Sequence, residues 1–213
     1  MRILLAAATP FEVKNLADRL PASVQPVITG VGLVSTAYHL QKAITAYIPD
    51  LVLQAGIAGC FDPTRPLGSV VVVSEEVIAD LGVEENGRFK DLTGLGLLDP
   101  DEFPYTAGLL PNPHVDGLNV LGLPKVRSAS VSEITTRPER IRWYGEHYAP
   151  VVESMEGAAL HYVCLQEKVP FLQVRALSNY IGERDKSRWQ MGLSLDRLQE
   201  AITNMVDTLN GQL

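Results

Sequence analysis

The chain has 213 residues, 46% of them apolar, which is long enough to bury a core of its own. The formal net charge of −7 argues against a nucleic-acid partner, because no basic excess exists to displace counterions from phosphates. No apolar run approaches the length of a membrane span, so no membrane partner is expected. The widely separated Cys60 and Cys164 favour a reduced, cytoplasmic protein over a disulfide scaffold.

Apolar runs alternate with helical patterns along the first part of the chain. The pattern predicts a strand over 3–8, a helix over 11–19, a strand over 24–29, a helix over 34–47 and a strand over 51–55. Pro10 suits the first turn of the first helix. The glycines of 30–32 and 56–59 predict turns after two of the strands, where the backbone can approach a ligand closely.

The second part of the chain continues the alternation. The pattern predicts strands over 69–78 and 125–131, a helix over 137–148, a strand from 151, a helix over 156–167, a strand over 171–177 and a helix over 195–209. The segment 82–114 is rich in Gly, Pro and Asp, which makes it a candidate lid or subunit-contact region. We expect one domain over 1–213, a three-layer α/β/α sandwich around a central twisted mixed sheet.

Polar residues stand near the ends of three predicted strands: Glu12, Glu156 and Asn179. Each has an ordinary structural explanation, since first-turn glutamates complement a helix dipole and asparagine often starts a turn. In an open α/β sheet, ligands bind outside the carboxyl ends of the strands. We therefore expect these three side chains to meet on one rim.

Several motifs point to one family. They are Met155-Glu156 with Ala158-Ala159, the run Arg175 to Asn179, the glycine turns Gly30–Gly32 and Gly56–Gly59, and Gly68 to Ser74. In this order they resemble the nucleoside phosphorylase and nucleosidase superfamily over nearly the whole chain. Within it the chain is similar to the methylthioadenosine/adenosylhomocysteine nucleosidases and to the futalosine hydrolases.

The resemblance implies cleavage of the N-glycosidic bond between a purine and a ribose, without a metal or cofactor. Glu156 matches the glutamate that binds the ribose 2′- and 3′-hydroxyls, and Glu12 matches the one that positions and activates the attacking water. It also implies substrate contacts for Met155, Ser178, Ala58, Gly59 and Ile134. Family members pair subunits so that a neighbour closes the pocket, so a homo-oligomer, dimer or higher, is expected.

Asn179 departs from the adenine-specific branch, which carries aspartate at this position. An amide cannot donate a proton to the base, but its NH₂ can serve the N7 and O6 acceptors of a 6-oxopurine. Asn179 therefore favours hypoxanthine as the leaving group.

Futalosine hydrolases are similar in carrying asparagine here, followed by an Arg-Asp pair and a tryptophan. Arg184 or Arg188 could bind the benzoate carboxylate of futalosine, and Trp189 or Phe103 could pack on its aryl ring. Stacking on the purine could come from Tyr180. The same loop could equally be a solvated charged loop with one aromatic anchor.

The nucleophile is predicted to be water, because the loop 7–12 brings a carboxylate and no arginine to bind phosphate. We therefore predict hydrolysis of futalosine in menaquinone biosynthesis. An adenine-releasing nucleosidase stays open, as does a non-catalytic nucleoside-binding protein, for which Glu12 would have no use. The incomplete fingerprint at 30–35 is weak support for a dinucleotide site.

Overall fold

The computed structural model describes residues 1–14, 16 and 20–211. Among these, the main sheet has eight strands. They are β1 (Ile3–Ala7), β2 (Val24–Ile28), β3 (Leu51–Cys60), β4 (Val70–Ile78), β7 (Leu110–Pro111), β8 (Lys125–Ser130), β9 (Val152–Ser154) and β10 (Phe171–Tyr180). Strands β2, β1, β3 and β10 run parallel, whereas β9 is antiparallel to β3 and β4 is antiparallel to β10. The sheet is mixed, as the sequence predicts.

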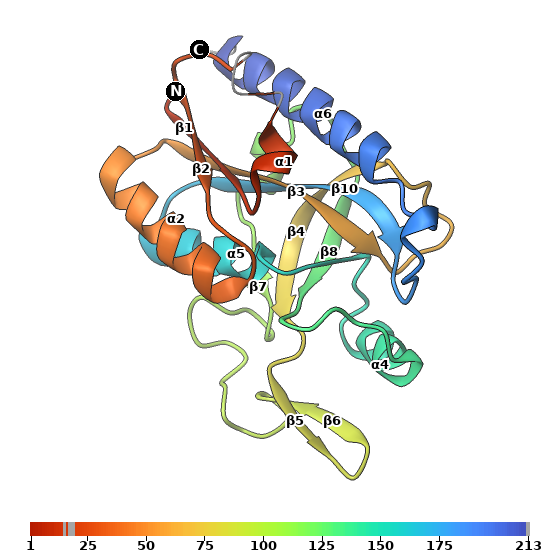
Figure 1. Ribbon diagram of the computed structural model, residues 1–213. Coiled ribbons are helices and arrows are strands. Elements are labelled where there is room, and N and C mark those ends of the chain that lie inside the picture. The colour runs from red at the N-terminus through yellow and green to blue at the C-terminus, as the bar shows by residue number, and fades with distance from the viewer. Residues whose placement is uncertain (15, 17–19, 212–213) are drawn as a thin grey trace.

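Part of the sheet closes on itself. The strand order is β10-β4-β8-β9-β3-β1-β2, and β10 pairs in addition with β3. Strands β3, β10, β4, β8 and β9 therefore form a ring, from which β1 and β2 extend as an open wing (Figure 1).

Helices cover both faces of the wing and its neighbours (Figure 1). Helices α2 (Leu33–Tyr47) and α5 (Gly157–Glu167) pack on one face with Leu4 and Ala6 of β1. Helices α1 (Pro10–Val13), α3 (Val115–Leu118) and α6 (Met191–Gly211) pack on the other with Ile3 and Leu5. Because side chains alternate along a strand, one fully apolar strand supplies both cores. The predicted three-layer arrangement is confirmed.

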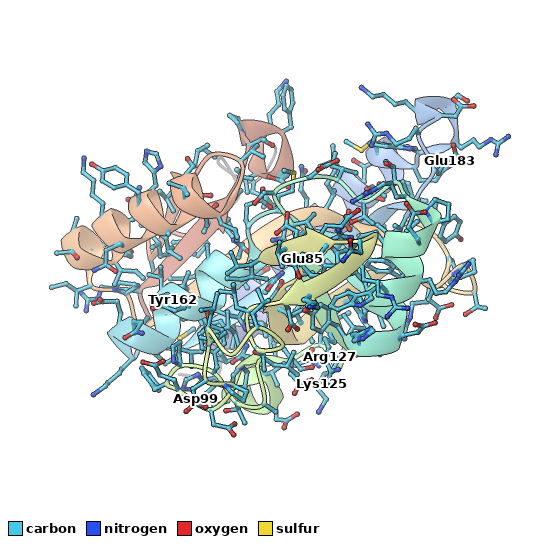
Figure 2. All side chains as sticks on the ribbon, turned by 90° about the horizontal axis from the view of Figure 1, so that it is seen from below. Glu85, Asp99, Lys125, Arg127, Tyr162 and Glu183 are labelled. Carbon is cyan, nitrogen blue, oxygen red and sulfur yellow. The ribbon has the colours of Figure 1, made fainter. Side chains whose placement is uncertain are left out.

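The segment 82–114 is more ordered than its composition suggests. It contains a hairpin of β5 (Gly82–Glu85) and β6 (Arg88–Asp91), which projects from the main body in Figure 1, and it ends in β7. Its remaining loop packs on α5, where the rings of Tyr105 and Tyr162 have centroids 6.3 Å apart. Figure 2 shows Asp99 of this loop and Tyr162 on one side of the molecule and Glu183 on the other.

Several predicted boundaries are wrong. The glycine turn over 56–59 is instead the end of β3, because β10 and β9 continue the backbone ladder through these small residues. For the same reason β10 extends to Tyr180 and includes Asn179. Helix α6 begins at Met191 rather than 195. The predicted helix over 11–19 is seen as α1, and its later part lies largely outside the described residues.

The remaining helix, α4 (Pro138–His147), packs outside the ring through Tyr144 and lies close to its predicted bounds. No helix in the described part of the chain combines the length and the apolar character needed to cross a membrane.

Candidate active site

A cavity of about 530 Å³ opens at the carboxyl ends of β1, β3, β9 and β10. The structure brings together in its lining nine of the residues that the sequence proposes for the site: Glu12, Ala58, Gly59, Ile134, Met155, Glu156, Ser178, Asn179 and Arg184. They come from five separate stretches of the chain. They lie close together because the ends of the strands meet at one rim of the sheet. No residue of 82–114 lines the cavity, and its role as a subunit contact stays a prediction.

Glu12 is held by the start of its own helix. Its Oε2 accepts hydrogen bonds from the backbone N–H of Thr9 at 2.9 Å and from the Thr9 hydroxyl at 3.2 Å, while Oε1 accepts from the N–H of Ile57 at 3.2 Å. The side chain is 7% exposed. Burial raises the pKa of Glu12, against the opposing effects of the Arg175 charge and these hydrogen bonds. A carboxylate with a raised pKa is a stronger base.

Glu156 is placed at the N-cap of α5 and faces Arg175 of β10, with Oε2 3.6 Å from Nη1. Its Oε1 accepts from the N–H of Gly32 at 3.2 Å. Arg175 is 1% exposed and also donates to Oε1 of Gln54 at 2.8 Å. The sequence identifies no partner for Arg175, and the structure supplies one. The buried guanidinium fixes the position of the carboxylate while leaving lone pairs free for hydroxyl groups.

Gly56 makes this arrangement possible. A Cβ at this position would lie 2.0 Å from Nη1 of Arg175 and 3.1 Å from Oε1 of Glu12. The guanidinium passes directly over the β3 backbone in the space that a side chain would fill, so only glycine fits there.

The amide of Asn179 has a defined orientation. Its Nδ2 donates to the carbonyl of Tyr180 at 3.1 Å, and its Oδ1 accepts from the Ser178 hydroxyl at 2.8 Å. A flipped amide would set two oxygens against each other at Tyr180. One lone pair of the amide oxygen is therefore engaged, and the second N–H, beside the other lone pair, remains for a ligand.

Arg184 and Trp189 form the wall between β10 and α6. The guanidinium carbon of Arg184 lies 5.6 Å from the Trp189 ring centroid, within the range of a cation–π contact. Trp189 is fixed by the hydrogen bond from its Nε1 to the carbonyl of Glu183 at 3.1 Å. Both residues line the cavity.

Three alternatives from the sequence lie elsewhere. Arg188 pairs with Glu183 at 2.9 Å and Phe103 is 61% exposed, and neither lines the cavity. Tyr180 packs in the cluster with Leu177 and donates its hydroxyl to the carbonyl of Arg65 at 3.0 Å, so it is not positioned to stack on a bound base. The alternation of side chains along β10 explains this, because Tyr180 and Asn179 point to opposite faces.

Glu153 also belongs to the site, although no sequence motif marks it. It lies on β9, is 6% exposed, and lines the cavity. The motif that carries the resemblance includes Glu156 but not Glu153. Nothing in the local sequence marks the apolar lining residues, such as Phe11 and Ile181, as part of a site.

The comparison with family models matches residues 22–210 to the Phosphorylase superfamily. The chain belongs to this superfamily. The resemblance inferred from the motifs is thereby confirmed.

Relatives of two enzyme types within this superfamily are similar to the chain. A futalosine hydrolase of Streptomyces coelicolor is 31% identical over 205 residues, covering 90% of this chain and 82% of that protein. A 5′-methylthioadenosine/S-adenosylhomocysteine nucleosidase of Anoxybacillus flavithermus is 27% identical, covering 89% and 82%. The solved structure of a futalosine hydrolase of Helicobacter pylori shares the fold, with a TM-score of 0.80, 16% identity and 97% coverage of both chains. At the level of enzyme class, the prediction of an N-glycosyl hydrolase is confirmed.

Proposed function

We propose that this chain hydrolyses the N-glycosidic bond of futalosine and releases hypoxanthine and dehypoxanthine futalosine, as a step of menaquinone biosynthesis. The observation that carries the choice of base is the orientation of Asn179, whose Oδ1 accepts from Ser178 and whose second N–H has no partner within the described structure. N7 and O6 of a 6-oxopurine both accept hydrogen bonds. An adenine would present its 6-amino donor beside that N–H, and only the second lone pair of Oδ1, whose first already accepts from Ser178, could receive it.

The two carboxylates divide the rest of the chemistry. Glu156 accepts the ribose 2′- and 3′-hydroxyls and its charge favours the positive sugar of the transition state, with Met155 packed beside it. Glu12 holds and deprotonates the water that attacks the anomeric carbon. The bound base lies beside Ala58 and Gly59 with Ile134 as a wall. Their presence in one cavity supports this division.

Water is the nucleophile in this proposal because the carboxyl groups of the lining disfavour a free phosphate beside the sugar. Four of the described lining residues carry carboxyl groups and one carries a guanidinium: Glu12, Glu153, Glu156, Glu183 and Arg184. A phosphorylase needs cationic and N–H groups around a phosphate. Arg175 is buried behind Glu156 and Gln54 and is already paired.

Arg184 binds the carboxylate at the far end of the substrate, and the Trp189 indole packs against the aryl ring. Arg184 has no acidic partner within the described residues, and a guanidinium matches a carboxylate with two parallel hydrogen bonds. The similarity to the Streptomyces coelicolor futalosine hydrolase over 90% of this chain supports the same substrate. We also propose a homo-oligomer, dimer or higher, in which the segment 82–114 takes part in subunit contact.

The test is chromatographic measurement of purine release from futalosine, inosine, methylthioadenosine and aminodeoxyfutalosine, each with and without phosphate. We expect hypoxanthine from futalosine at the highest kcat/KM and no effect of phosphate. Faster release of adenine would favour the second candidate, an adenine-releasing nucleosidase like the Anoxybacillus flavithermus relative. A requirement for phosphate would overturn hydrolysis.

A further inference from the structure

Helix α5 begins without the help of its own N-cap side chain. The side chain of an N-cap residue normally accepts a hydrogen bond from the backbone N–H two or three residues later. Glu156 is the N-cap of α5 and makes no such bond, because its carboxylate faces Gly32 and Arg175 instead. The first residues of the helix are buried, so their N–H groups need other acceptors.

Two serines of neighbouring strands take over the capping. The N–H of Gly157 donates to Oγ of Ser154 at 3.3 Å. The N–H of Ala158 donates to Oγ of Ser130 at 2.8 Å. Ser130 of β8 and Ser154 of β9 are partners in the register of the two strands. The start of α5 is therefore attached to the sheet at two adjacent points, and the side chain of Glu156 is left free for the cavity.

Ser130 is itself held by a buried carboxyl group. Its hydroxyl donates to Oε2 of Glu76 at 3.0 Å, and Oε1 of Glu76 accepts from Nε2 of Gln173 at 2.9 Å. All three side chains are fully buried. The single hydroxyl hydrogen of Ser130 is committed to Glu76, so a lone pair of the same oxygen is available to the N–H of Ala158. Glu76 thereby determines how Ser130 meets the helix.

The first residue of the helix lies directly on Glu76. A Cβ added to Gly157 would collide with Oε1 of Glu76 and with Nε2 of Gln173, so only glycine permits this close approach. Any displacement of the Glu76 carboxyl group therefore changes the position at which α5 begins, one residue from Glu156.

We propose that Glu76, acting through Ser130, is a positioning residue for Glu156. The carboxyl group of Glu76 orients Ser130, Ser130 holds the second residue of α5, and the start of the helix sets where the Glu156 carboxylate stands in the cavity. This inference rests on the proposed function, in which Glu156 binds the ribose hydroxyls. Glu76 and Ser130 do not line the cavity, so they act on a ligand only through Glu156.

A pair of uncleavable ligands isolates the ribose contact. 9-Deazainosine has a carbon–carbon glycosidic bond that water cannot hydrolyse and carries both ribose hydroxyls, whereas 9-deazahypoxanthine is the same base without the sugar. Ser130→Ala removes the link between Glu76 and α5. We expect its Kd for 9-deazainosine to rise by about tenfold or more, the effect of one weakened charge-assisted hydrogen bond, and its Kd for 9-deazahypoxanthine to change by less than about twofold. Calorimetry measures both constants.

The matched control is Ser128→Ala. Ser128 lies two residues before Ser130, on the same face of β8, and is equally buried. Its hydroxyl lies near Glu76 without a hydrogen-bond partner within the described structure. Each substitution removes one buried hydroxyl from the same strand, so a general packing effect would appear in both. Ser128→Ala should change neither dissociation constant by more than about twofold, because it breaks no hydrogen bond.

Changes at Glu76 test whether it acts as the acceptor for Ser130. Glu76→Gln keeps an oxygen for the Ser130 hydroxyl, and Gln173 can turn its amide so that its own unpartnered oxygen accepts the new N–H. Glu76→Leu offers no acceptor. We expect wild-type affinity for 9-deazainosine in Glu76→Gln and a loss of about tenfold or more in Glu76→Leu. Wild-type affinity in Glu76→Leu would overturn the role of Glu76. Ser130→Ala, the smaller change, decides the matter if Glu76→Leu does not fold.

The outcomes separate this inference from the proposed function. A wild type that binds 9-deazainosine no more tightly than 9-deazahypoxanthine would refute the ribose contact of the proposed function before any variant is made. If the wild type releases adenine instead of hypoxanthine, 9-deazaadenosine and 9-deazaadenine replace the two ligands and the comparison is unchanged. In a wild type that binds the nucleoside more tightly, equal losses for nucleoside and base in Ser130→Ala, or no loss for either, would overturn the positioning role alone.

Discussion

Nη1 of Arg175 lies 3.6 Å from Oε2 of Glu156 in a buried ion pair that fixes the ribose side of the cavity. Removing one partner of a buried pair leaves an uncompensated charge and costs about 3–5 kcal/mol. We expect Arg175→Met to lower the free energy of unfolding by about this amount, measured by urea denaturation at neutral pH. The control is Arg197→Ala, which breaks an exposed pair with Glu200 and should cost less than about 1 kcal/mol. Equal effects would contradict the structural role of Arg175.

Glu12→Gln should lose about 10²–10⁴-fold in kcat and still bind hypoxanthine with little change, because a glutamine cannot take the proton from water. Glutamine also suits this position of a capping box, so α1 should be retained. Turnover and calorimetric binding of hypoxanthine provide the two readouts. Unchanged turnover would remove Glu12 from the mechanism.

The acid side of the pH profile should report Glu12. The base must be ionised, and its pKa is raised by burial above the ordinary value of 4.5. As the pH falls through the raised pKa, the protonated fraction grows and kcat falls, at a higher pH than for an exposed glutamate. Glu12→Gln should lose this acid limb. An acid limb that persists unchanged in the variant would belong to another group.

Gly56→Ala should inactivate the protein without removing any functional side chain. The new Cβ would lie 2.0 Å from Nη1 of Arg175, so the guanidinium and the two carboxylates around it must shift. A misplacement of about 1 Å can cost roughly 10² in rate. Gly145→Ala is the control, since nothing lies within 4 Å of a Cβ at that helical position. It should leave activity unchanged and stabilise α4 by up to about 1 kcal/mol.

Glu76 should make the stability of the protein depend on pH. It is fully buried and accepts hydrogen bonds from Gln173 at 2.9 Å and Ser130 at 3.0 Å, and burial raises its pKa. The unfolded chain therefore loses this proton first, near pH 4.5. Between that pH and the folded pKa, the free energy of unfolding should fall by up to about 1.4 kcal/mol per pH unit.

In Glu76→Gln this contribution to the pH dependence of the free energy of unfolding should vanish. Glu12 and Glu153 contribute with the same sign in both proteins. The difference in slope between wild type and variant therefore measures the contribution of Glu76. Urea denaturation at several pH values measures both slopes. Parallel slopes would show that Glu76 keeps the same pKa in both states.

Arg184→Gln should raise KM for futalosine by about tenfold, the effect of one charge-assisted hydrogen bond at a partly exposed site. It should leave KM for inosine unchanged, because inosine has no distal carboxylate. Lys186→Gln, a neighbouring cation outside the cavity, is the control for general loss of positive charge. Equal losses on both substrates would contradict a tail-binding role.

The sequence located Glu12, Glu156 and Asn179 because each stands just after an apolar run that is visible locally, and the ends of such runs share a rim. It could not pair Arg175 with Gln54, since 121 residues separate them and the contact depends on the register of β10 against β3. The glycines of 56–59 predict a turn because small residues have a weak preference for strands. Pairing on both sides overrides that preference in the folded chain.

Arg184 and Trp189 come from the connection between β10 and α6, whereas the carboxylates and the amide stand on or beside paired strands. Loops tolerate insertions and exchanges far better than strands do. Grafting this connection from a relative should therefore retune which 5′ substituent is admitted without disturbing bond cleavage. Selectivity for the distal group of the substrate and the rate of bond cleavage can then change independently among proteins that share this fold.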